Sequence, residues 1–582
     1  MSAVGLATPT VVSPATSQGG SLRAAGTLQS SGGVAEPLAT AAVLPSVTAY
    51  TPSGAATSYA ANTASAAGTD LRFLHVTQMP GSLETAQATY EALLSVQTRG
   101  GQMQVWEQLP DDALAQVMGR NASGTTEQGR MAGLGSALLE QVAATGASYR
   151  QTIVNVGAAY SPDQIQRKAS DALWAFKSRP SASAELTIQT QSGAKVRLSI
   201  TDQREYSATG SGMSVAIEVD GELTAQERDA LKALAAGFDK AVQGLAGDEP
   251  RLDLEDLLKF DSKVLTQVEL KFEHYGRDSE GKRVLQLGAD VRLDASRRDV
   301  EIKTREGVVK MSTDLRQPAQ WGSAAQKDKA VAQYLARIDQ AAERGRADPG
   351  LVDLFKSTFS AMHVSYAQQG SDSDTNRLGM KPGSIPLRSD GDAFSEEDQS
   401  LMTGLADFKA SIAATNRATN PRRTQERDSF QYTLNQSTEI SGSNRGSRAV
   451  SQTQTSKLSA AYHQSLLTSA APKFDSTSAS QNYVYNTVED SSTTEMRLAY
   501  EAGEPVLATL SHQASQSLHM IRVENNQVVD TRTTPGQQSS HKDLLPLIKE
   551  LKRQQRDQEA SERERQDTLD SLHALVLQVS RA

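Results

Sequence analysis

The chain has 582 residues, a formal net charge of −9, 38% hydrophobic and only 5% aromatic residues, and no cysteine. The acidic balance argues against a general nucleic-acid-binding protein, which would need a basic surface to contact phosphates. A cysteine-free chain has no disulfides, no cysteine-ligated metal centres and no thiol nucleophiles. No window approaches the about 20 apolar residues that a membrane-spanning helix requires, so we expect no membrane span.

Residues 1–68 consist mostly of Ala, Ser, Thr, Gly, Pro and Val, with Arg23 and Glu36 as the only charged side chains. Such a segment cannot bury enough apolar surface to offset the entropy of ordering it, which predicts a disordered tail over residues 1–69. The basic start and apolar stretch of a Sec-type signal are not found in it. A long, acid-poor, Ser/Thr-rich N-terminus resembles the unfolded leaders of substrates of bacterial type III or flagellar export.

Residues 70–180 are predicted to form a helical region. Apolar residues recur at helical spacing over 83–94 and over 134–142. A third helix is expected to begin at Pro162, after Ser161 as its N-cap, and to end before Pro180.

Residues 181–368 are predicted to form an α+β domain around an antiparallel sheet. Apolar and polar residues alternate over 184–200, around a turn at 191–193, and again over 213–219. A β-meander is expected over 264–311, and its interleaved charged and amide residues are typical of a sheet with one wet face. The turns of this meander are expected at 277–281 and 306–307, and the helices of the domain at 224–245, 252–260, 323–344 and 351–368.

A polar linker is predicted over residues 369–394, and residues 395–535 are predicted to hold a helix at 396–413 and a second antiparallel β region. Gly503 and the pair Asn525-Asn526 supply turns in that region. Residues 536–582 are predicted to be a C-terminal helix, whose nearly all-charged or amide middle is either a solvated face or a partner-binding arm.

The predicted fold class is therefore α+β. Antiparallel β-meanders pack with helices, between a disordered N-terminal tail and a charged C-terminal helix. The sequence leaves open whether the two β regions share one sheet or form separate domains.

The segment AIEVDGELTAQE, residues 216–227, matches part of an EF-hand calcium loop. Glu218 and Asp220 occupy the third and fifth ligand positions, and Glu227 occupies the last. The first position is Ala216, which offers no side-chain oxygen. An Asp-Gly turn followed by a Thr-x-x-Glu capping box explains the same residues, and we prefer this interpretation to a metal site.

Other chemical motifs are weak or absent. The acidic run at 372–376 begins like a calcium loop, but Arg377 replaces the turn glycine and Gly383 the closing glutamate, so a linker is the better interpretation. The eight histidines form no H-x-x-x-H or H-E-x-x-H pair. There is no Gly-x-Ser-x-Gly elbow, dinucleotide fingerprint or Walker loop. We therefore predict no cofactor and assign no catalytic residue.

Residues 184–272 contain three elements in a fixed order, which read LTIQTQSGAKVRLSI, VAIEVDGELTAQERDALKAL and LLKFDSKVLTQVELKF. This order of hairpin, strand, helix and strand resembles a group of uncharacterised proteins of gammaproteobacterial type that have a Ser/Gly-rich N-terminus. The resemblance is confined to these residues and implies no activity, cofactor or partner.

The leading functional hypothesis is a non-enzymatic bacterial protein, exported or associated with a secretion or motility apparatus, that acts through protein–protein contacts. It would be cytoplasmic, or exported without a Sec-type signal. One alternative is a secreted effector or toxin whose catalytic groups meet only in the fold, which a pocket joining polar residues of both β regions would favour. Another is a cytosolic scaffold or regulator, which cell fractionation would distinguish.

Overall fold

The computed structural model describes residues 71–74, 94–99, 102–157, 164, 179–206, 210–364, 366, 394–442, 445–468, 471–556 and 562–578. All of them lie within one unit, residues 63–582. The predicted tail over 1–69 and the acidic run at 372–376 lie outside the described residues. Three further predicted segments lie mostly outside the described residues: residues 83–93 of the helix predicted over 83–94, the helix predicted from Pro162 except for residue 164, and residues 369–393 of the linker.

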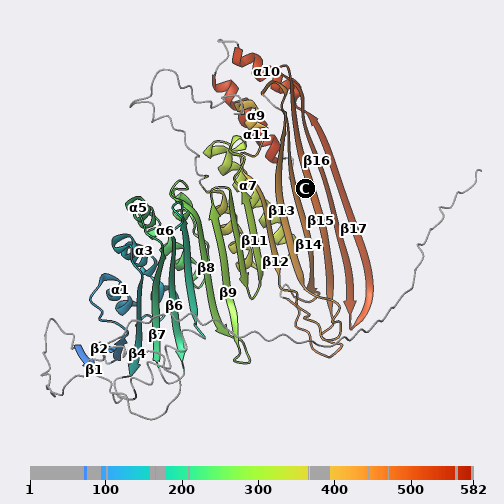
Figure 1. Cartoon of the computed structure of the whole chain (residues 1–582). Helices are drawn as coiled ribbons and strands as arrows, with labels where there is room; N and C mark the ends of the chain where they lie inside the picture. Colours follow the sequence, from blue (N-terminus) through green and yellow to red (C-terminus); the bar gives the residue numbers. More distant parts are fainter. Residues whose placement is uncertain are drawn as a thin grey trace, which may run out of the picture. The chain divides into compact units, whose positions relative to one another are not determined.

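A single antiparallel sheet of 17 strands organises the described part of the chain (Figure 1). The register of each pair gives the order β1-β2-β3-β4-β7-β6-β5-β8-β9-β10-β11-β12-β13-β14-β15-β16-β17. The strands are β1 (Leu71–Leu74), β2 (Leu94–Arg99), β3 (Gln102–Trp106), β4 (Tyr149–Gly157), β5 (Ala182–Thr190), β6 (Lys195–Tyr206), β7 (Gly210–Asp220), β8 (Leu265–Arg277), β9 (Arg283–Asp294), β10 (Arg297–Thr304), β11 (Gly307–Asp314), β12 (Asp407–Ala414), β13 (Ser429–Ser441), β14 (Ala449–Ser465), β15 (Tyr483–Glu501), β16 (Glu504–Glu524) and β17 (Gln527–Asp543).

The two predicted β regions belong to this one sheet, because β11 pairs with β12 along eight residues, from Gly307↔Ala414 to Asp314↔Asp407. The helix predicted at 396–413 is therefore wrong. Only Glu396–Ser400 is helical, and the residues of β12 alternate between buried and more exposed positions with the period of a strand. The antiparallel sheet with helices, predicted from the residue patterns, is confirmed.

One face of the sheet is buried from β4 to β14. A single row of cross-strand neighbours illustrates this, and every member is buried: Gln151, Val215, Ile200, Ala184, Phe272, Ala289, Ile302, Val309, Ile412, Tyr432 and Leu458. The neighbouring positions on the opposite face are polar, as in Lys271, Asp290 and Glu301. Side-chain alternation along each strand thus produces one wet face, as the sequence predicted.

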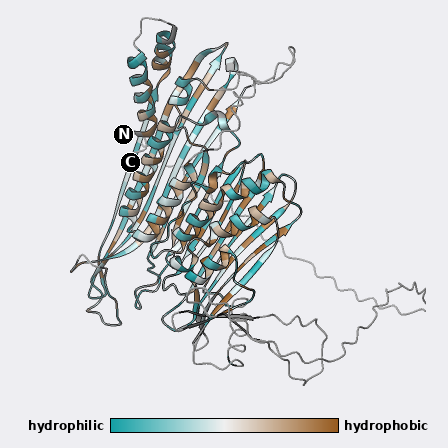
Figure 2. Cartoon of the chain, turned by 90° about the vertical axis from the view of Figure 1, so that its left-hand side faces the viewer, coloured by the Kyte–Doolittle hydropathy of each residue, from teal (hydrophilic) through white to brown (hydrophobic). Residues whose placement is uncertain are grey.

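The helices cover the buried face (Figures 1 and 2). They pack on β4, β6, β10–β12, β14 and β16. Of the residues described, no helix combines the length and apolar composition needed to cross a membrane. The helices are α1 (Ala113–Asn121), α2 (Glu127–Met131), α3 (Leu134–Thr145), α5 (Ala225–Ala233), α6 (Ala235–Leu245), α7 (Ala324–Gly345), α8 (Pro349–His363), α9 (Glu396–Ser400), α10 (Leu545–Arg556) and α11 (Glu562–Gln578).

Several predicted helices are shorter than expected or are replaced by strands. Residues 70–180 contain strands β1–β4 beside helices α1–α3. The helix predicted over 224–245 is divided at Leu234 into α5 and α6. Only Leu257–Lys259 is helical in the segment predicted over 252–260, where Leu252 and Leu254 are buried two residues apart, as extended chain allows.

The last strand, β17, corrects the prediction that the C-terminal helix begins at residue 536. Residues 536–543 instead pair with β16, and α10 begins at Leu545. Nearly all of β17 is exposed, so it lacks the alternation of apolar residues that would have revealed a strand. It forms one edge of the sheet. The ladder with β16 continues through Pro535, opposite Ser517. Since proline has no N–H to donate, its nitrogen faces the open edge.

The hairpin turns predicted for the second β region are confirmed. Ala502 and Gly503, between β15 and β16, have φ values of 49° and 85°, and Asn525 and Asn526, between β16 and β17, have 48° and 69°. Positive φ at both central residues is the conformation of a type I′ turn, whose twist matches that of the strands. Glycine and asparagine adopt it at low cost.

Substitution of Ile412 tests the continuity of the sheet. Its side chain is 1% exposed and lies between Val309 of β11 and Tyr432 of β13. Ile412→Ala should lower the free energy of unfolding by about 2–5 kcal/mol, measured by urea denaturation, because it leaves a cavity in a packed core. The half-exposed Val529→Ala is the matched control and should cost much less. Equal losses for the two variants would contradict the pairing of β11 with β12.

Candidate functional site: an arginine-lined cavity

The residues of the calcium-like segment form the predicted helix cap. The Glu227 carboxylate accepts hydrogen bonds from the Thr224 backbone N–H at 2.9 Å and the Ser192 hydroxyl at 2.6 Å, and Thr224 Oγ1 accepts from Glu227 N at 3.2 Å. Burial would raise the pKa of Glu227, but these hydrogen bonds outweigh it and lower the pKa to about 2. Glu218 and Asp220 lie on β7, where Glu218 is 3.8 Å from Arg197. Across the described ranges, no group of three or more ligating side chains is suited to a metal.

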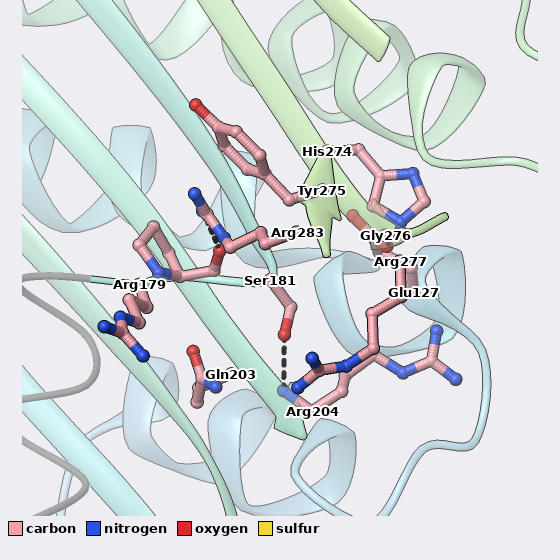
Figure 3. A pocket seen from close by; sticks show the side chains of 11 residues that line it. Glu127, Arg179, Ser181, Gln203, Arg204, His274, Tyr275, Gly276, Arg277 and Arg283 are labelled. Atoms are coloured by element: carbon pink, nitrogen blue, oxygen red, sulfur yellow. Dashed lines mark hydrogen bonds and ion pairs between the residues drawn. The ribbon is translucent and has the colours of Figure 1, made fainter. Parts of the chain in front are cut away.

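A cavity of about 790 Å³ lies at one end of the sheet, where β5 and β9 begin, β6 and β8 end, and α2 starts. Figure 3 shows the side chains that surround it. Four of them are arginines, which come from different chain segments: Arg179, Arg204, Arg277 and Arg283.

The β8–β9 hairpin places two of these arginines side by side. Arg277 and Arg283 are direct cross-strand partners, an arrangement of like charges that usually destabilises a sheet. Arg283 lies over the ring of Tyr275, with its guanidinium carbon 3.4 Å from the ring centroid, and donates to the Pro180 carbonyl at 2.6 Å. Arg277 donates to the Gly281 carbonyl at 2.9 Å. These contacts hold the two guanidinium groups in place beside the cavity.

Arg204 is positioned from β6. Its backbone N–H donates to Ser181 Oγ at 3.0 Å, and its guanidinium donates to the Thr125 carbonyl. A buried ion pair between Arg130 of α2 and Asp202 lies two residues before Arg204 on β6. Arg130 Nε donates to Asp202 Oδ1 at 2.8 Å. Because both charges of this pair are almost fully buried, it fixes α2 against the strand that carries Arg204.

Among the described residues that line the cavity, Glu127 is the one carboxylate, and it faces His274 (Figure 3). His274 Nε2 and Glu127 Oε2 are 2.9 Å apart, and the Glu127 side chain is 4% exposed. Burial raises the pKa of Glu127, and its contact with His274 only partly opposes that effect. Among the described residues that line the cavity, arginines therefore outnumber carboxylates by four to one.

A second cluster of polar side chains surrounds His463 on β14. Its Nδ1 lies 2.7 Å from Asp428 and its Nε2 lies 3.0 Å from Glu426, which also accepts a hydrogen bond from the Tyr483 hydroxyl at 2.6 Å. Burial would lower the pKa of His463, but the two carboxylates outweigh it and raise the pKa. Since each ring nitrogen is held by a carboxylate, this imidazole has no nitrogen left to act as a general base.

The stability of the fold should depend on pH through the His463 cluster. A raised histidine pKa contributes stability below its unfolded pKa of about 6.5, and this contribution is lost as pH rises through the folded pKa. Burial would raise the pKa of Glu426, but hydrogen bonds from its partners His463 and Tyr483 outweigh burial and lower this pKa. Glu426 therefore stabilises the fold at pH values above its unfolded pKa of about 4.3, and this stabilisation is lost as the pH falls through the lowered pKa of the folded state. In urea titrations of the wild type, the free energy of unfolding should fall as the pH rises through the raised pKa of His463. His463→Gln should remove this decrease.

The partly exposed His519, whose Nδ1 is 2.9 Å from the Thr533 hydroxyl and not from a carboxylate, provides the control. His519→Gln should leave the pH profile of unfolding unchanged. If His463→Gln also has the wild-type profile, the imidazole is not held as a cation.

Comparison of the chain with protein-family models, curated proteins and solved structures found no match. Guanidinium groups bind carboxylates and phosphates through paired hydrogen bonds, and none of the four arginines is a nucleophile or a base at neutral pH. The cavity is best suited to binding anionic groups.

Proposed function

We propose that the protein is a non-enzymatic bacterial protein that acts by binding another protein, and that the arginine-lined cavity receives an acidic segment of that partner. The observation that carries this proposal is that Arg204 and Arg283, whose guanidinium groups donate to backbone carbonyls, line the same cavity as two further arginines. Electrostatic complementarity of this kind speeds association and selects partners of opposite charge.

The size of the cavity favours a chain segment with several carboxylates. A volume of about 790 Å³ lies in the range of pockets that hold drug-sized ligands, so it can take several side chains at once. Arg204 and Arg283 reach it from different strands, with hydrogen bonds to backbone carbonyls rather than to carboxylates. A planar guanidinium that is already oriented loses little entropy on binding a carboxylate.

The composition of the cavity favours binding over catalysis. His274, the one imidazole among its described lining residues, faces Glu127, and the Ser181 hydroxyl accepts a hydrogen bond from the backbone of Arg204. All of its lining strands come from the first β region. The alternative of an enzyme or toxin called for polar groups of both β regions meeting in one pocket, which this cavity does not provide. A pocket that does so has Glu306, Thr415 and His463 among its lining residues, and both ring nitrogens of that imidazole are held by carboxylates.

Charge reversal in the cavity tests the proposal. Arg204→Glu and Arg283→Glu should each weaken the binding of a fluorescently labelled oligoglutamate peptide by about tenfold or more, measured by anisotropy, because each replaces an attraction with a repulsion. The exposed Arg292 on the wet face, 3.5 Å from Glu269, provides the control Arg292→Glu, which should bind as the wild type does. Added salt should weaken wild-type binding.

Glu127→Gln provides a variant with the opposite effect. Removal of the single carboxylate should tighten peptide binding at neutral pH, and the difference from wild type should disappear as pH falls through the raised pKa of Glu127. Failure of the full-length protein to bind the acidic peptide, or equal loss with Arg292→Glu, would reject the cavity as the site.

We further propose that this protein is exported by, or associated with, a secretion or motility apparatus. The composition of residues 1–68 supports this part of the proposal. Deletion of residues 2–68 should abolish secretion in the native host and leave the melting temperature unchanged. Undiminished export of the shortened protein would contradict it.

A further inference from the structure

A buried arginine lies between α7 and the long strands, far along the sheet from the cavity described above. Arg337 is only 8% exposed. Its Nη2 donates to the Leu577 carbonyl at 3.3 Å, and its guanidinium carbon is 4.8 Å from the ring centroid of Tyr334. Its Nε has no hydrogen-bond partner, and no carboxylate of the described residues forms an ion pair with it. A buried charge without a counterion is strongly disfavoured, so this position calls for an anion.

A small niche beside Arg337 has room for an anion. Its volume is about 90 Å³, and its lining includes Arg344, Tyr432, Ser456 and Ser492. The two serines are cross-strand partners on β14 and β15, with hydroxyl oxygens 2.8 Å apart. Because a single water needs only about 10–15 Å³ of such space, the niche has room for a small polyatomic anion.

The charges around the niche leave Arg337 uncompensated. Arg344 is paired with Asp490, which accepts from Arg344 Nη2 at 3.0 Å, so these two charges cancel. Burial raises the pKa of Tyr432 to about 12, and that phenol stays neutral. Burial lowers the pKa of His512, whose imidazole is also repelled by Arg337. Gln340 and Gln516 complete the polar lining without charge.

We propose that this niche is a binding site for a small oxyanion of the phosphate type. Arg337 would supply the charge, while the hydroxyls of Ser456, Ser492 and Tyr432 can donate hydrogen bonds to oxygen atoms. The Arg344 side chain is 33% exposed, so the niche borders on solvent at that side. The same chemistry fits inorganic phosphate and the phosphoryl group of a larger ligand. The site is independent of the arginine-lined cavity and of the function proposed for it.

Titration with inorganic phosphate tests the assignment. Phosphate should raise the melting temperature of the wild-type protein in a saturable way, because a ligand that binds only the folded state stabilises it. Arg337→Gln should weaken the phosphate affinity at least tenfold in calorimetry, and circular dichroism should first show that the variant is folded. The control Lys356→Gln removes a cation on neighbouring α8 that is paired with Asp339, and it should respond like the wild type.

A second variant keeps Arg337 in place. Ser492→Asp puts a carboxylate into the niche, which should occupy the guanidinium and abolish the part of the phosphate response that persists in an Arg204→Glu, Arg283→Glu background. An equal response to phenyl phosphate and phosphate would identify the phosphoryl group of a larger ligand as a possible occupant, whereas a response to phosphate alone would identify the free ion. A wild-type protein that does not respond to phosphate, or an undiminished response in both niche variants, would overturn the assignment.

Discussion

The pairing of β11 with β12 is the constraint on which the rest of the structure depends. It joins strands between which the described chain forms three α-helices, α7, α8 and α9, and it continues the buried row from Val309 to Ile412 without a change of face. A shift of one residue at this point would turn every apolar side chain of β12 toward water. The helices of both halves can cover the same face of the sheet only because this register is kept.

Charged side chains are distributed unevenly over the sheet. On the wet face, acids and bases alternate and pair with each other, as Glu301 does with Lys303 and Lys310. At the strand ends around the arginine-lined cavity, and beside Arg337, positive groups outnumber the acids near them. An excess of positive groups lowers the stability of the fold when no ligand is bound, because like charges repel. Proteins concentrate such excess charge at binding sites.

The sequence predicted the parts of the fold that depend on neighbouring residues. The turn at Asn525-Asn526 and the cap at Thr224 and Glu227 are local devices, and both are present. The strand β17 was missed because its residues are mostly polar and nearly all exposed, so they show no alternation of apolar and polar side chains. Both arginine sites were also missed, since Arg204 and Arg283, or Arg337 and Ser492, meet only through pairing between distant segments. The pair Arg277 and Arg283 around a predicted turn was the one local signal of positive charge.

The outer strand of the sheet has a consequence for the protein in concentrated solution. β17 offers a 17-residue edge to any passing chain, and a long edge of this kind can template fibres. Pro535, in the middle of β17, has no backbone N–H to donate to an added strand. An added strand would also bring its own side chains close to the charged side chains of Asp530, Arg532 and Lys542. The same features that hid this strand from sequence patterns therefore protect the sheet from growing beyond its last strand.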